Sequence, residues 1–176
     1  AMRELGVTYP LSPQQLVECD KTSLGCNGGL QERAYNYVKR NGGIETEEAY
    51  PYTSGAAGEE GTCSADSSKF VLGLTGYETL KTEAYMTSYV KSTGPVSIAI
   101  DASTWSTYTG GILSDCGTDI NHAVQLVGVD TSAGYWKVRN SWSESWGESG
   151  YIRLAYGQDT CGITYDVTYV TGVKKV

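Results

Sequence analysis

The spacing of hydrophobic residues predicts helices early in the chain and mostly strands later. Helical spacing occurs in residues 13–19 and 30–40, and once more in residues 83–92. Short apolar runs and alternations predict four strands: GPVSIAI (94–100), NHAVQLVGVD (121–130), GYWKVRNSW (134–142) and GYIRLAY (150–156). Helices first and strands later indicate the α+β fold class.

Polar and glycine residues mark the ends of the first two predicted helices. Ser12 is expected to cap the first helix, with Pro13 at its first position and Gln15 at the capping-box position. The second helix is expected to end at NGG (41–43), because glycine favours a helix stop. Between the two helices, GCNGGL (25–30) places three glycines around a cysteine, so its backbone can approach another group closely.

A long irregular segment follows these helices. Residues 45–68 are rich in turn formers and have no periodic pattern, which predicts a surface loop pinned by Cys63. The composition then changes between Val71 and Tyr77, and this change is the best candidate for a boundary between two lobes. We therefore expect the remainder of a helical lobe in residues 1–71, and a β-rich lobe with a C-terminal tail in residues 72–176.

The predicted strand 121–130 carries His122, the only histidine of the chain. The valine-rich residues after it read as a mostly buried strand, so His122 is expected at the start of a core strand. Two interpretations are open from this pattern alone. The imidazole either packs and hydrogen-bonds without any chemistry, or it takes part in a reaction.

The composition limits the classes of partner. The chain has 40% hydrophobic residues, 14 Tyr and 4 Trp, which indicates a globular protein and excludes a disordered one. Its net charge of -7 disfavours nucleic acid, because phosphate binding depends on clustered Lys and Arg, and the only such cluster is Lys174 and Lys175 in the tail. No segment approaches the roughly 18 apolar residues of a membrane helix. Neither nucleic acid nor a membrane is therefore an expected partner.

Five cysteines are spread widely along the sequence: Cys19, Cys26, Cys63, Cys116 and Cys161. None forms a CxxC pair, and one histidine cannot complete a His-rich zinc site, so no metal is expected. The spacing suits disulfides and an oxidising compartment, and buried free thiols are the alternative. Because five is odd, one thiol is either free or has its partner outside this sequence.

The residues after the histidine strand are hard to explain as core filling. The stretch RNSWSESWGESGYIRL (139–154) places Asn140 close to Trp142, and Trp146 follows with a glycine. A buried Asn has up to four hydrogen-bonding sites, and a buried Trp needs a partner for its indole N–H. The stretch therefore indicates a polar group that is held in place and shielded.

With these residues in view, the chain resembles the papain-like cysteine proteases, the family of papain and the lysosomal cathepsins, with a cathepsin L-like layout. The resemblance covers essentially all 176 residues. Its motifs occur in the family's order with suitable gaps: SPQQLVECD (12–20), GCNGGL (25–30), YPY (50–52), GPVSIAI (94–100), YTGGIL (108–113), NHAVQLVGV (121–129), RNSWSESWGESGYIRL (139–154) and CGI (161–163). It implies a two-lobe fold, with an incomplete helical left lobe, an antiparallel β-barrel-like right lobe and a cleft between them.

The resemblance also implies roles for individual residues. It makes His122 the catalytic general acid/base and Asn140 the side chain that orients the imidazole. Trp142 would cover the hydrogen bond between them, and Trp146 would support the site. A thiolate stays charged beside an imidazolium, which then donates its proton to the leaving amine. Ser143 stands where the family usually has glycine, so the local backbone geometry is open to question.

A substrate-binding surface is implied as well. Its residues by this resemblance are Gly28, Gly29, Leu30, Ala99, Asn121, Ala123 and Asp166. The backbone of Gly29 would pair with an extended substrate, and Asp166 would lie at the floor of the pocket for the second residue before the scissile bond. A carboxylate there would accept Arg or Lys as well as apolar side chains. The alternative for Asp166 is a solvated surface acid.

The resemblance accounts for the odd cysteine. It implies the disulfides Cys19–Cys63 and Cys116–Cys161, and it pairs Cys26 with the first cysteine of a C-G-S-C-W motif that this sequence does not contain. That motif also carries the nucleophile. It lies about 130 to 150 residues before the histidine, which places the nucleophile roughly 8 to 28 residues upstream of Ala1. The chain alone is therefore expected to be inactive.

The expected function is thus an endopeptidase with a Cys-His-Asn mechanism whose nucleophile comes from an upstream segment. The alternative is a non-catalytic papain-like protein that binds peptides or proteins. Expected partners are a peptide or protein substrate, and they can include protein inhibitors and a cleaved or separate N-terminal peptide bridged to Cys26. No cofactor is expected, because thiol catalysis needs only a reduced nucleophile. The expected location is secreted, lysosomal or vacuolar.

Overall fold

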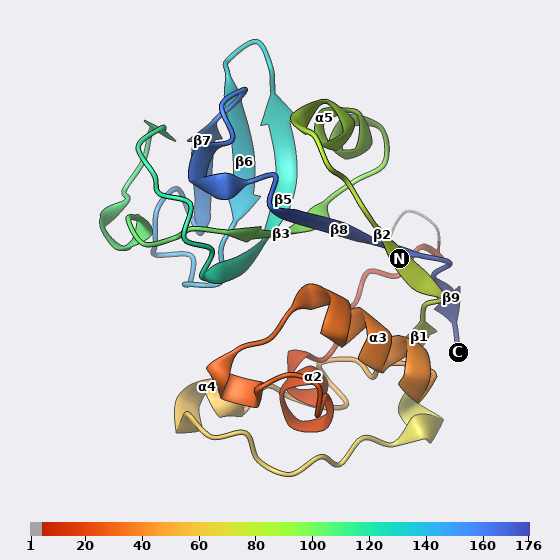
Figure 1. The fold of residues 1–176 in the computed structure, drawn as a ribbon. Coiled ribbons are helices and arrows are strands. Elements are labelled where there is room, and N and C mark those ends of the chain that lie inside the picture. Colours follow the sequence, from red (N-terminus) through yellow and green to blue (C-terminus); the bar gives the residue numbers. More distant parts are fainter. Residues whose placement is uncertain (1–4) are drawn as a thin grey trace. The chain divides into compact units, whose positions relative to one another are not determined.

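The computed structural model describes residues 5–176, and they divide into two compact units (Figure 1). The first unit comprises the described residues up to Glu78 together with Val170–Val176, and the second unit is Thr79–Tyr169. The division lies further along the chain than the boundary expected after residue 71. The end of the chain belongs to the first unit because it pairs with Leu72 and Gly73 there.

The first unit is mainly helical. Its elements are α2 (Pro13–Cys19), η1 (Gly25–Asn27), α3 (Gln31–Asn41), α4 (Ser54–Ala57), η2 (Ser67–Lys69) and a two-stranded sheet of β1 (Leu72–Gly73) and β9 (Lys174–Lys175). Its core is formed by Val7, Tyr37, Val38, Ile44, Leu72 and Leu74. The two predicted helices are confirmed, and Gly42 ends α3 with a left-handed φ of 89°.

Only one of the two hydrogen bonds of the predicted capping box at the start of α2 is present. Ser12 Oγ accepts a hydrogen bond from the Gln15 N–H (3.0 Å). The Gln15 side chain does not return the bond. Instead its Nε2 donates to the Tyr37 hydroxyl (3.1 Å) and its Oε1 accepts from the Glu45 N–H (2.8 Å). Since the Ser12 N–H donates to the Glu45 carbonyl oxygen (3.0 Å), no capping box is needed, and Gln15 ties the helix to neighbouring segments.

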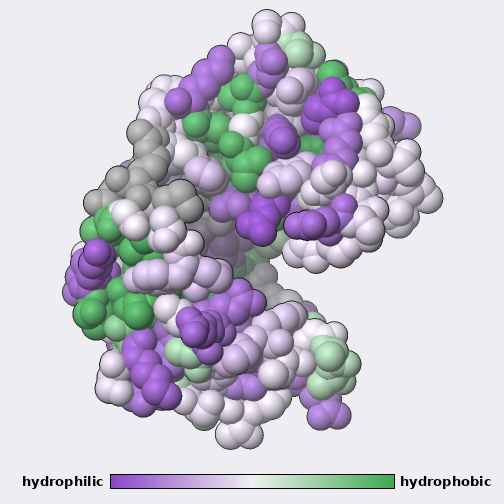
Figure 2. Space-filling model, turned by 180° about the vertical axis from the view of Figure 1, so that it is seen from behind, coloured by the Kyte–Doolittle hydropathy of each residue, from purple (hydrophilic) through white to green (hydrophobic). Residues whose placement is uncertain are grey.

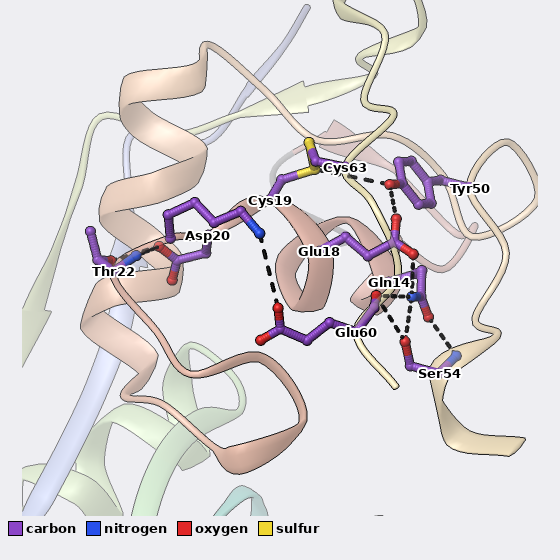
Figure 3. A network of polar contacts seen from close by, with 10 residues as sticks. Gln14, Glu18, Cys19, Asp20, Thr22, Tyr50, Ser54, Glu60 and Cys63 are labelled. Atoms are coloured by element: carbon purple, nitrogen blue, oxygen red, sulfur yellow. Dashed lines mark hydrogen bonds and ion pairs between the residues drawn. A yellow bond between two sulfur atoms is a disulfide. The ribbon is translucent and has the colours of Figure 1, made fainter. Parts of the chain in front are cut away.

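A buried polar network fixes the segment after residue 45 to α2 (Figure 3). Gln14 Nε2 donates to Glu18 Oε1 (2.9 Å) and to Ser54 Oγ (2.6 Å), while Gln14 Oε1 accepts from the Ser54 N–H (3.0 Å). The Tyr50 hydroxyl donates to Glu18 Oε2, and burial raises the pKa of this hydroxyl. The segment predicted as an irregular loop therefore contains the short helix α4. Its first residue, Ser54, is hydrogen-bonded to Gln14.

The second unit contains most of the seven-stranded sheet. Its strands are β2 (Gly76–Thr79), β3 (Val96–Ile100), β4 (Ile112–Leu113), β5 (His122–Asp130), β6 (Tyr135–Arg139), β7 (Tyr151–Ala155) and β8 (Asp166–Thr171), and β2 and β8 include residues of both units. Their order is β2-β8-β3-β5-β6-β7-β4. β4 pairs parallel with β7, and the central pairs are antiparallel. Because β2 and β4 are the ends of this order, the expected barrel-like sheet is open and not closed into a barrel. Helices in the first unit and this sheet in the second confirm the α+β fold class.

The core of the second unit combines residues of this sheet with Met86 of α5 (Glu83–Ser92), the predicted third helix, and with residues of the connecting segments. Its fully buried side chains include Met86, Ile98, Ile100, Trp105, Leu126, Trp136, Ile152, Leu154 and Ile163. Burial of apolar surface on this scale is the main force that holds the unit together. On the face drawn in Figure 2, hydrophobic residues appear in groups interrupted by hydrophilic ones.

Strand β5 is less buried than its valine-rich sequence predicts. Leu126 is its only buried residue, and Ala123 and Gln125 are exposed. Antiparallel strands commonly pack one face on the core and leave the other accessible, and β5 follows that pattern near its start. Among residues 5–176, no helix is long and apolar enough to cross a membrane.

Candidate active site

The candidate site is formed where β5 begins and β6 ends. These two strands are antiparallel neighbours, with Gln125 opposite Arg139, so the first residue of β5 and the residue after β6 lie at the same edge of the sheet. His122 is that first residue, and Asn140 directly follows β6. His122 Nε2 lies 2.9 Å from Asn140 Oδ1, and the imidazole is partly buried. The topology thus brings together the two residues that the sequence proposes as catalytic.

The neighbouring backbone determines which way the Asn140 amide faces. The Ser141 N–H donates to Asn140 Oδ1 (2.8 Å). Because a backbone N–H can only donate, the atom that faces both Ser141 and His122 is the amide oxygen. His122 Nε2 must therefore carry a proton and donate it. Its Nδ1 has no hydrogen-bond partner among residues 5–176 and is left for another group.

Aromatic rings surround the imidazole. The Trp142 ring stacks on His122 with centroids 5.3 Å apart, and the buried Trp105 ring meets His122 edge-on at 6.2 Å. Trp146 packs against both indoles, and its Nε1 donates to the Trp105 carbonyl oxygen (3.0 Å). Trp142 itself remains 39% exposed. These rings restrict the orientation of the imidazole and reduce the access of water to one of its faces.

The loop from Asn140 to Gly150 closes on itself. The Asn140 N–H donates to the Gly150 carbonyl oxygen (2.9 Å), and the Gly150 N–H donates to the Trp146 carbonyl oxygen (2.7 Å). Gly147 has a left-handed φ of 57°, and a Cβ there would lie 2.6 Å from the Tyr151 carbonyl oxygen. Only glycine fits this position, which explains the Trp-Gly pair of the sequence.

Ser143 adopts a left-handed φ of 75°, a region that favours glycine. Its hydroxyl lies 2.7 Å from Ser145 Oγ and accepts from the Ser145 N–H (3.1 Å). A serine occupies a glycine-like conformation, and local hydrogen bonds offset part of the strain.

Three of the proposed substrate-binding residues form one row across the sheet. Ala99 on β3 lies opposite Ala123 on β5 and opposite Asp166 on β8. Directly opposed residues share a face of the sheet, so their side chains lie side by side. Ala99 is buried, Ala123 is exposed and Asp166 is partly buried. The row therefore has the buried Ala99 in its middle, the exposed Ala123 at one end and the partly buried Asp166 at the other.

Asn121 has a different environment from the one proposed. Its Nδ2 donates to Asp101 Oδ1 (3.1 Å), Ser103 Oγ (2.9 Å) and the Asp119 carbonyl oxygen (2.8 Å). Its Oδ1 accepts from the Ala102 N–H (2.9 Å). The side chain is thus fully engaged within the protein, and the backbone N–H donates to the Ile100 carbonyl oxygen (3.0 Å), so neither is left for a substrate.

The remaining substrate-binding candidates belong to the first unit. Gly28 has a φ of 105°, and its carbonyl oxygen accepts from the Leu24 N–H (2.8 Å). A Cβ on Gly29 would lie 2.7 Å from Ser23 Oγ, so this position also requires a residue without a side chain. Leu30 precedes α3 and is 48% exposed. The three residues form a continuous accessible stretch.

Both expected disulfides are present. Cys19 is bonded to Cys63 and Cys116 to Cys161, with Cα atoms 4.9 and 4.8 Å apart. Cys26 is the free cysteine of the described chain, and it is exposed. No group of three or more metal-ligating side chains occurs within residues 5–176.

Sequence reasoning missed two residues that shape the site. Trp105 lies in the turn after β3, in a run of Ser and Thr without any periodic pattern, yet its ring contacts His122. Glu148 receives hydrogen bonds from Arg153 and from the Gly111 N–H (3.0 Å), and so joins the loop after Asn140 to another loop. Of these two residues, only Glu148 could have been found from the sequence, because it directly follows the Trp-Gly pair.

Comparisons with known proteins agree with this geometry. The family profile described as "Papain family cysteine protease" matches residues 2–171. Cysteine proteinase A of Leishmania mexicana is 45% identical over 157 residues, which cover 86% of this chain and 44% of that protein. Cathepsin L 2 of Paramecium tetraurelia is 42% identical over 162 residues, which cover 91% of this chain and 49% of that protein. The chain spans about half the length of the curated relatives it matches.

Solved structures give the same result for the fold. The digestive procathepsin L 3 of the Tenebrio molitor larval midgut superposes with a TM-score of 0.88 at 36% identity, over 97% of this chain and 58% of that chain. The Carica candamarcensis cysteine protease CMS1MS2, solved in complex with E-64, has a TM-score of 0.85 at 33% identity, over 97% of this chain and 81% of that chain.

Proposed function

Because the chain belongs to the papain family of cysteine proteases, we propose that the protein hydrolyses peptide bonds as a thiol-dependent endopeptidase. The single observation that carries the proposal is the 2.9 Å contact between His122 Nε2 and Asn140 Oδ1. It directs the protonated nitrogen into the protein and leaves Nδ1 for a thiol. An imidazole held in this way can keep a neighbouring thiolate charged and later protonate the leaving amine.

The nucleophile is proposed to come from outside these 176 residues. Four of the five cysteines are bonded in disulfides, and a disulfide sulfur cannot act as a thiolate. The fifth, Cys26, lies in GCNGG, which does not resemble the family's C-G-S-C-W motif. We assign the nucleophile to that motif in a segment upstream of Ala1, and Cys26 to a disulfide with the same segment. The segment can be continuous with this chain or a separate peptide.

The chain by itself is accordingly proposed to be inactive. The test compares residues 1–176 with a protein that also contains the C-G-S-C-W segment, using a fluorogenic dipeptidyl amide. The longer protein should turn over the substrate until a thiol alkylator is added, and the shorter one should not. Alkylator-sensitive turnover by residues 1–176 would contradict the assignment of the nucleophile. Failure of the longer protein would favour the alternative, a papain-like protein that binds peptides without cleaving them.

The bridge to Cys26 has its own test. Intact mass is measured with and without reductant, and release of a small peptide by the reductant would identify the partner of Cys26. Replacement of Cys26 by Ser provides the control, because the peptide should then be absent under both conditions. The two observed disulfides support an oxidising location, and we propose a secreted, lysosomal or vacuolar one.

Substrate preference is proposed to depend on the row of Ala99, Ala123 and Asp166. Two small side chains leave room for a substrate side chain, and the carboxylate can pair with Arg or Lys in that space. The backbone of Gly29 is proposed to bind the extended substrate. On the active protein, replacement of Asp166 by Ala should reduce cleavage after Arg-Arg more than cleavage after Phe-Arg. Equal effects on both substrates would exclude this role for Asp166.

A further inference from the structure

We propose that Asp101 is a positioning residue for His122, acting through Asn121 and through the turn that carries Trp105. This inference rests on the proposed function, because positioning matters for catalysis only if His122 is the acid/base. All the residues concerned belong to the second unit.

Asp101 is buried, with a relative exposure of 3% for the residue. Its Oδ1 accepts from the Ser103 N–H (2.9 Å) and from Asn121 Nδ2 (3.1 Å), and its Oδ2 accepts from the Asp119 N–H (3.1 Å). Gly117 closes the remaining side, because a Cβ there would lie 2.5 Å from Oδ2. The carboxylate therefore joins the turn at Ser103, the loop at residues 117–119 and the residue before β5.

None of the three ion pairs among the described residues involves Asp101. Its charge is balanced by neutral donors, and Asp119, a second acid in this region, contributes its backbone N–H to the hydrogen bonding. Hydrogen bonds from Ser103, first of all, hold the pKa of the Asp101 carboxyl below its usual value of 3.8. It stays ionised at neutral pH, and an ionised acceptor forms stronger hydrogen bonds than a neutral one.

Asn121 transmits this anchoring to the histidine, because it is the preceding residue. Its backbone N–H donates to the Ile100 carbonyl oxygen (3.0 Å), and its side chain bonds to Asp101 and to the Ala102 N–H (2.9 Å). Both the backbone and the side chain of Asn121 are therefore held. The start of β5 has little freedom to move, and the Cα of His122 is fixed with it.

The same turn places an indole against the imidazole. The Ala102 carbonyl oxygen accepts from the Trp105 N–H (3.0 Å), so the residue that Asn121 holds also anchors Trp105. The Trp105 ring is fully buried and meets the His122 ring edge-on at 6.2 Å. These contacts form a closed circuit, from His122 through Asn121 and the turn to Trp105 and back to His122. Asp101 joins this circuit through its hydrogen bonds with Asn121 and with Ser103 of the turn.

His122 is the only histidine of the chain, so its ring signals in nuclear magnetic resonance need no assignment. The experiment follows solvent exchange of the Nε2–H and the proximity of His122 and Trp105 ring protons in the 176-residue chain. Asp101→Asn replaces one accepting carboxylate oxygen by an amide N–H₂ group, which cannot accept a hydrogen bond from Ser103, Asn121 or Asp119. We expect the Nε2–H to exchange about fivefold faster, the effect of losing roughly one hydrogen bond, and the contact with Trp105 to weaken.

Two further variants make the result decisive. Thr118→Ala changes an exposed side chain in the same loop and should leave both signals unchanged. Asn121→Ala removes the side-chain hydrogen bonds of Asn121 to Asp101 and Ala102. It provides the same test if Asp101→Asn does not fold. The inference is overturned if the folded Asp101→Asn or Asn121→Ala variant has the same His122 exchange rate and Trp105 contact as Thr118→Ala.

The measurement needs no nucleophile, so it is independent of the proposed function. In the active protein, Asp101→Asn should lower kcat and leave KM nearly unchanged, because a positioning residue acts on the histidine and not on substrate binding. Loss of the ring contact together with an inactive long protein would refute the proposed function only. Unchanged ring signals in an active protein would refute the inference only.

Discussion

Arg153 Nη2 lies 2.6 Å from Glu148 Oε1, and Arg153 Nε lies 2.9 Å from Glu148 Oε2. The guanidinium thus grips the carboxylate with two nitrogens, the geometry that makes such pairs strongest. Glu148 also accepts from the Gly111 N–H, so the pair joins β7 to two loops. One of these loops carries Asn140 and its indole neighbours.

This ion pair makes the stability of the second unit depend on pH. The hydrogen bonds from Arg153 hold the pKa of Glu148 below its ordinary value of 4.5. A lowered pKa means that the stabilisation is complete above pH 4.5 and is lost as the pH falls through the lower folded-state value. Glu148→Gln should therefore lower the melting temperature by about 2–4 °C at pH 7, and by less at pH 3.

Thermal unfolding followed by circular dichroism at both pH values checks this expectation. Lys69→Gln is the matched control, because it breaks the more exposed pair of Lys69 and Asp66 and should shift the melting temperature by less than about 1 °C. An equal loss for Glu148→Gln at pH 7 and pH 3 would mean that its charge does not stabilise the loop.

In the active protein, the orienting role of Asn140 predicts a graded effect of two substitutions. Asn140→Ala removes the oxygen that accepts from His122 Nε2 and should lower kcat/KM about 10²-fold. Asn140→Asp keeps an oxygen for both His122 and the Ser141 N–H, so its loss should be within about tenfold. Steady-state kinetics on one fluorogenic substrate distinguishes them. Equal losses would show that the acceptor oxygen is not what the site requires.

The buried network of the first unit should depend on one hydroxyl. Tyr50 donates to Glu18 and accepts from the Ser64 N–H (2.9 Å), so Tyr50→Phe leaves a buried carboxylate oxygen and an N–H without a partner. We expect the free energy of unfolding to fall by about 1–3 kcal/mol, as measured by urea denaturation. Tyr52→Phe, at a residue that is 51% exposed, should change it by less than about 0.5 kcal/mol. Similar values for both variants would rule out a stabilising role for this network.

The two disulfides offer a comparison at constant loop length, since they span 44 and 45 residues. Chain entropy alone then predicts the same cost for removing either one, about 2–4 kcal/mol after partial compensation. Guanidinium unfolding of the double variants Cys19→Ala/Cys63→Ala and Cys116→Ala/Cys161→Ala measures both. In the 176-residue chain, where Cys26 is a free exposed thiol, Cys26→Ser should have almost no effect. A large difference between the two double variants would show that folded-state contacts outweigh loop entropy.

Local signals in the sequence were sufficient where the interactions are local. Ser12 bonds to a residue three positions away, and Gly42 needs only its own backbone freedom to end α3. Both follow from neighbouring residues, and both helices were predicted with nearly correct ends. The Ser12 cap also shows the limit, because Gln15 prefers partners at positions 37 and 45 that no local pattern reveals.

Strands and contacts between distant residues were harder to predict. β8 was not among the predicted strands, although Val, Thr and Tyr in DVTYVT favour a strand. Its position in the sheet comes from pairing with Ser97 and Ile98 on β3, which are distant in the sequence. Trp105 was missed because its contact with His122 joins residues that are distant in the sequence, and no local pattern reveals such a contact. His122 and Asn140 were found through ordered motifs, which carry information about contacts that spacing alone does not.

Ser143 allows the cost of its backbone conformation to be separated from its hydrogen bonds. Ser143→Ala keeps a Cβ at a φ of 75° but loses both contacts with Ser145, whereas Ser143→Gly loses the same contacts and removes the Cβ. The glycine variant should therefore be more stable than the alanine variant by about 1–2 kcal/mol in urea unfolding, since that is the cost of a side chain in the left-handed region. Ser106 in the short 3-10 helix η3 (Trp105–Thr107), which has no positive φ, provides the control. There the order should reverse, because glycine loses more backbone entropy on folding than alanine does. The same order at both positions would mean that the conformation of Ser143 carries no strain.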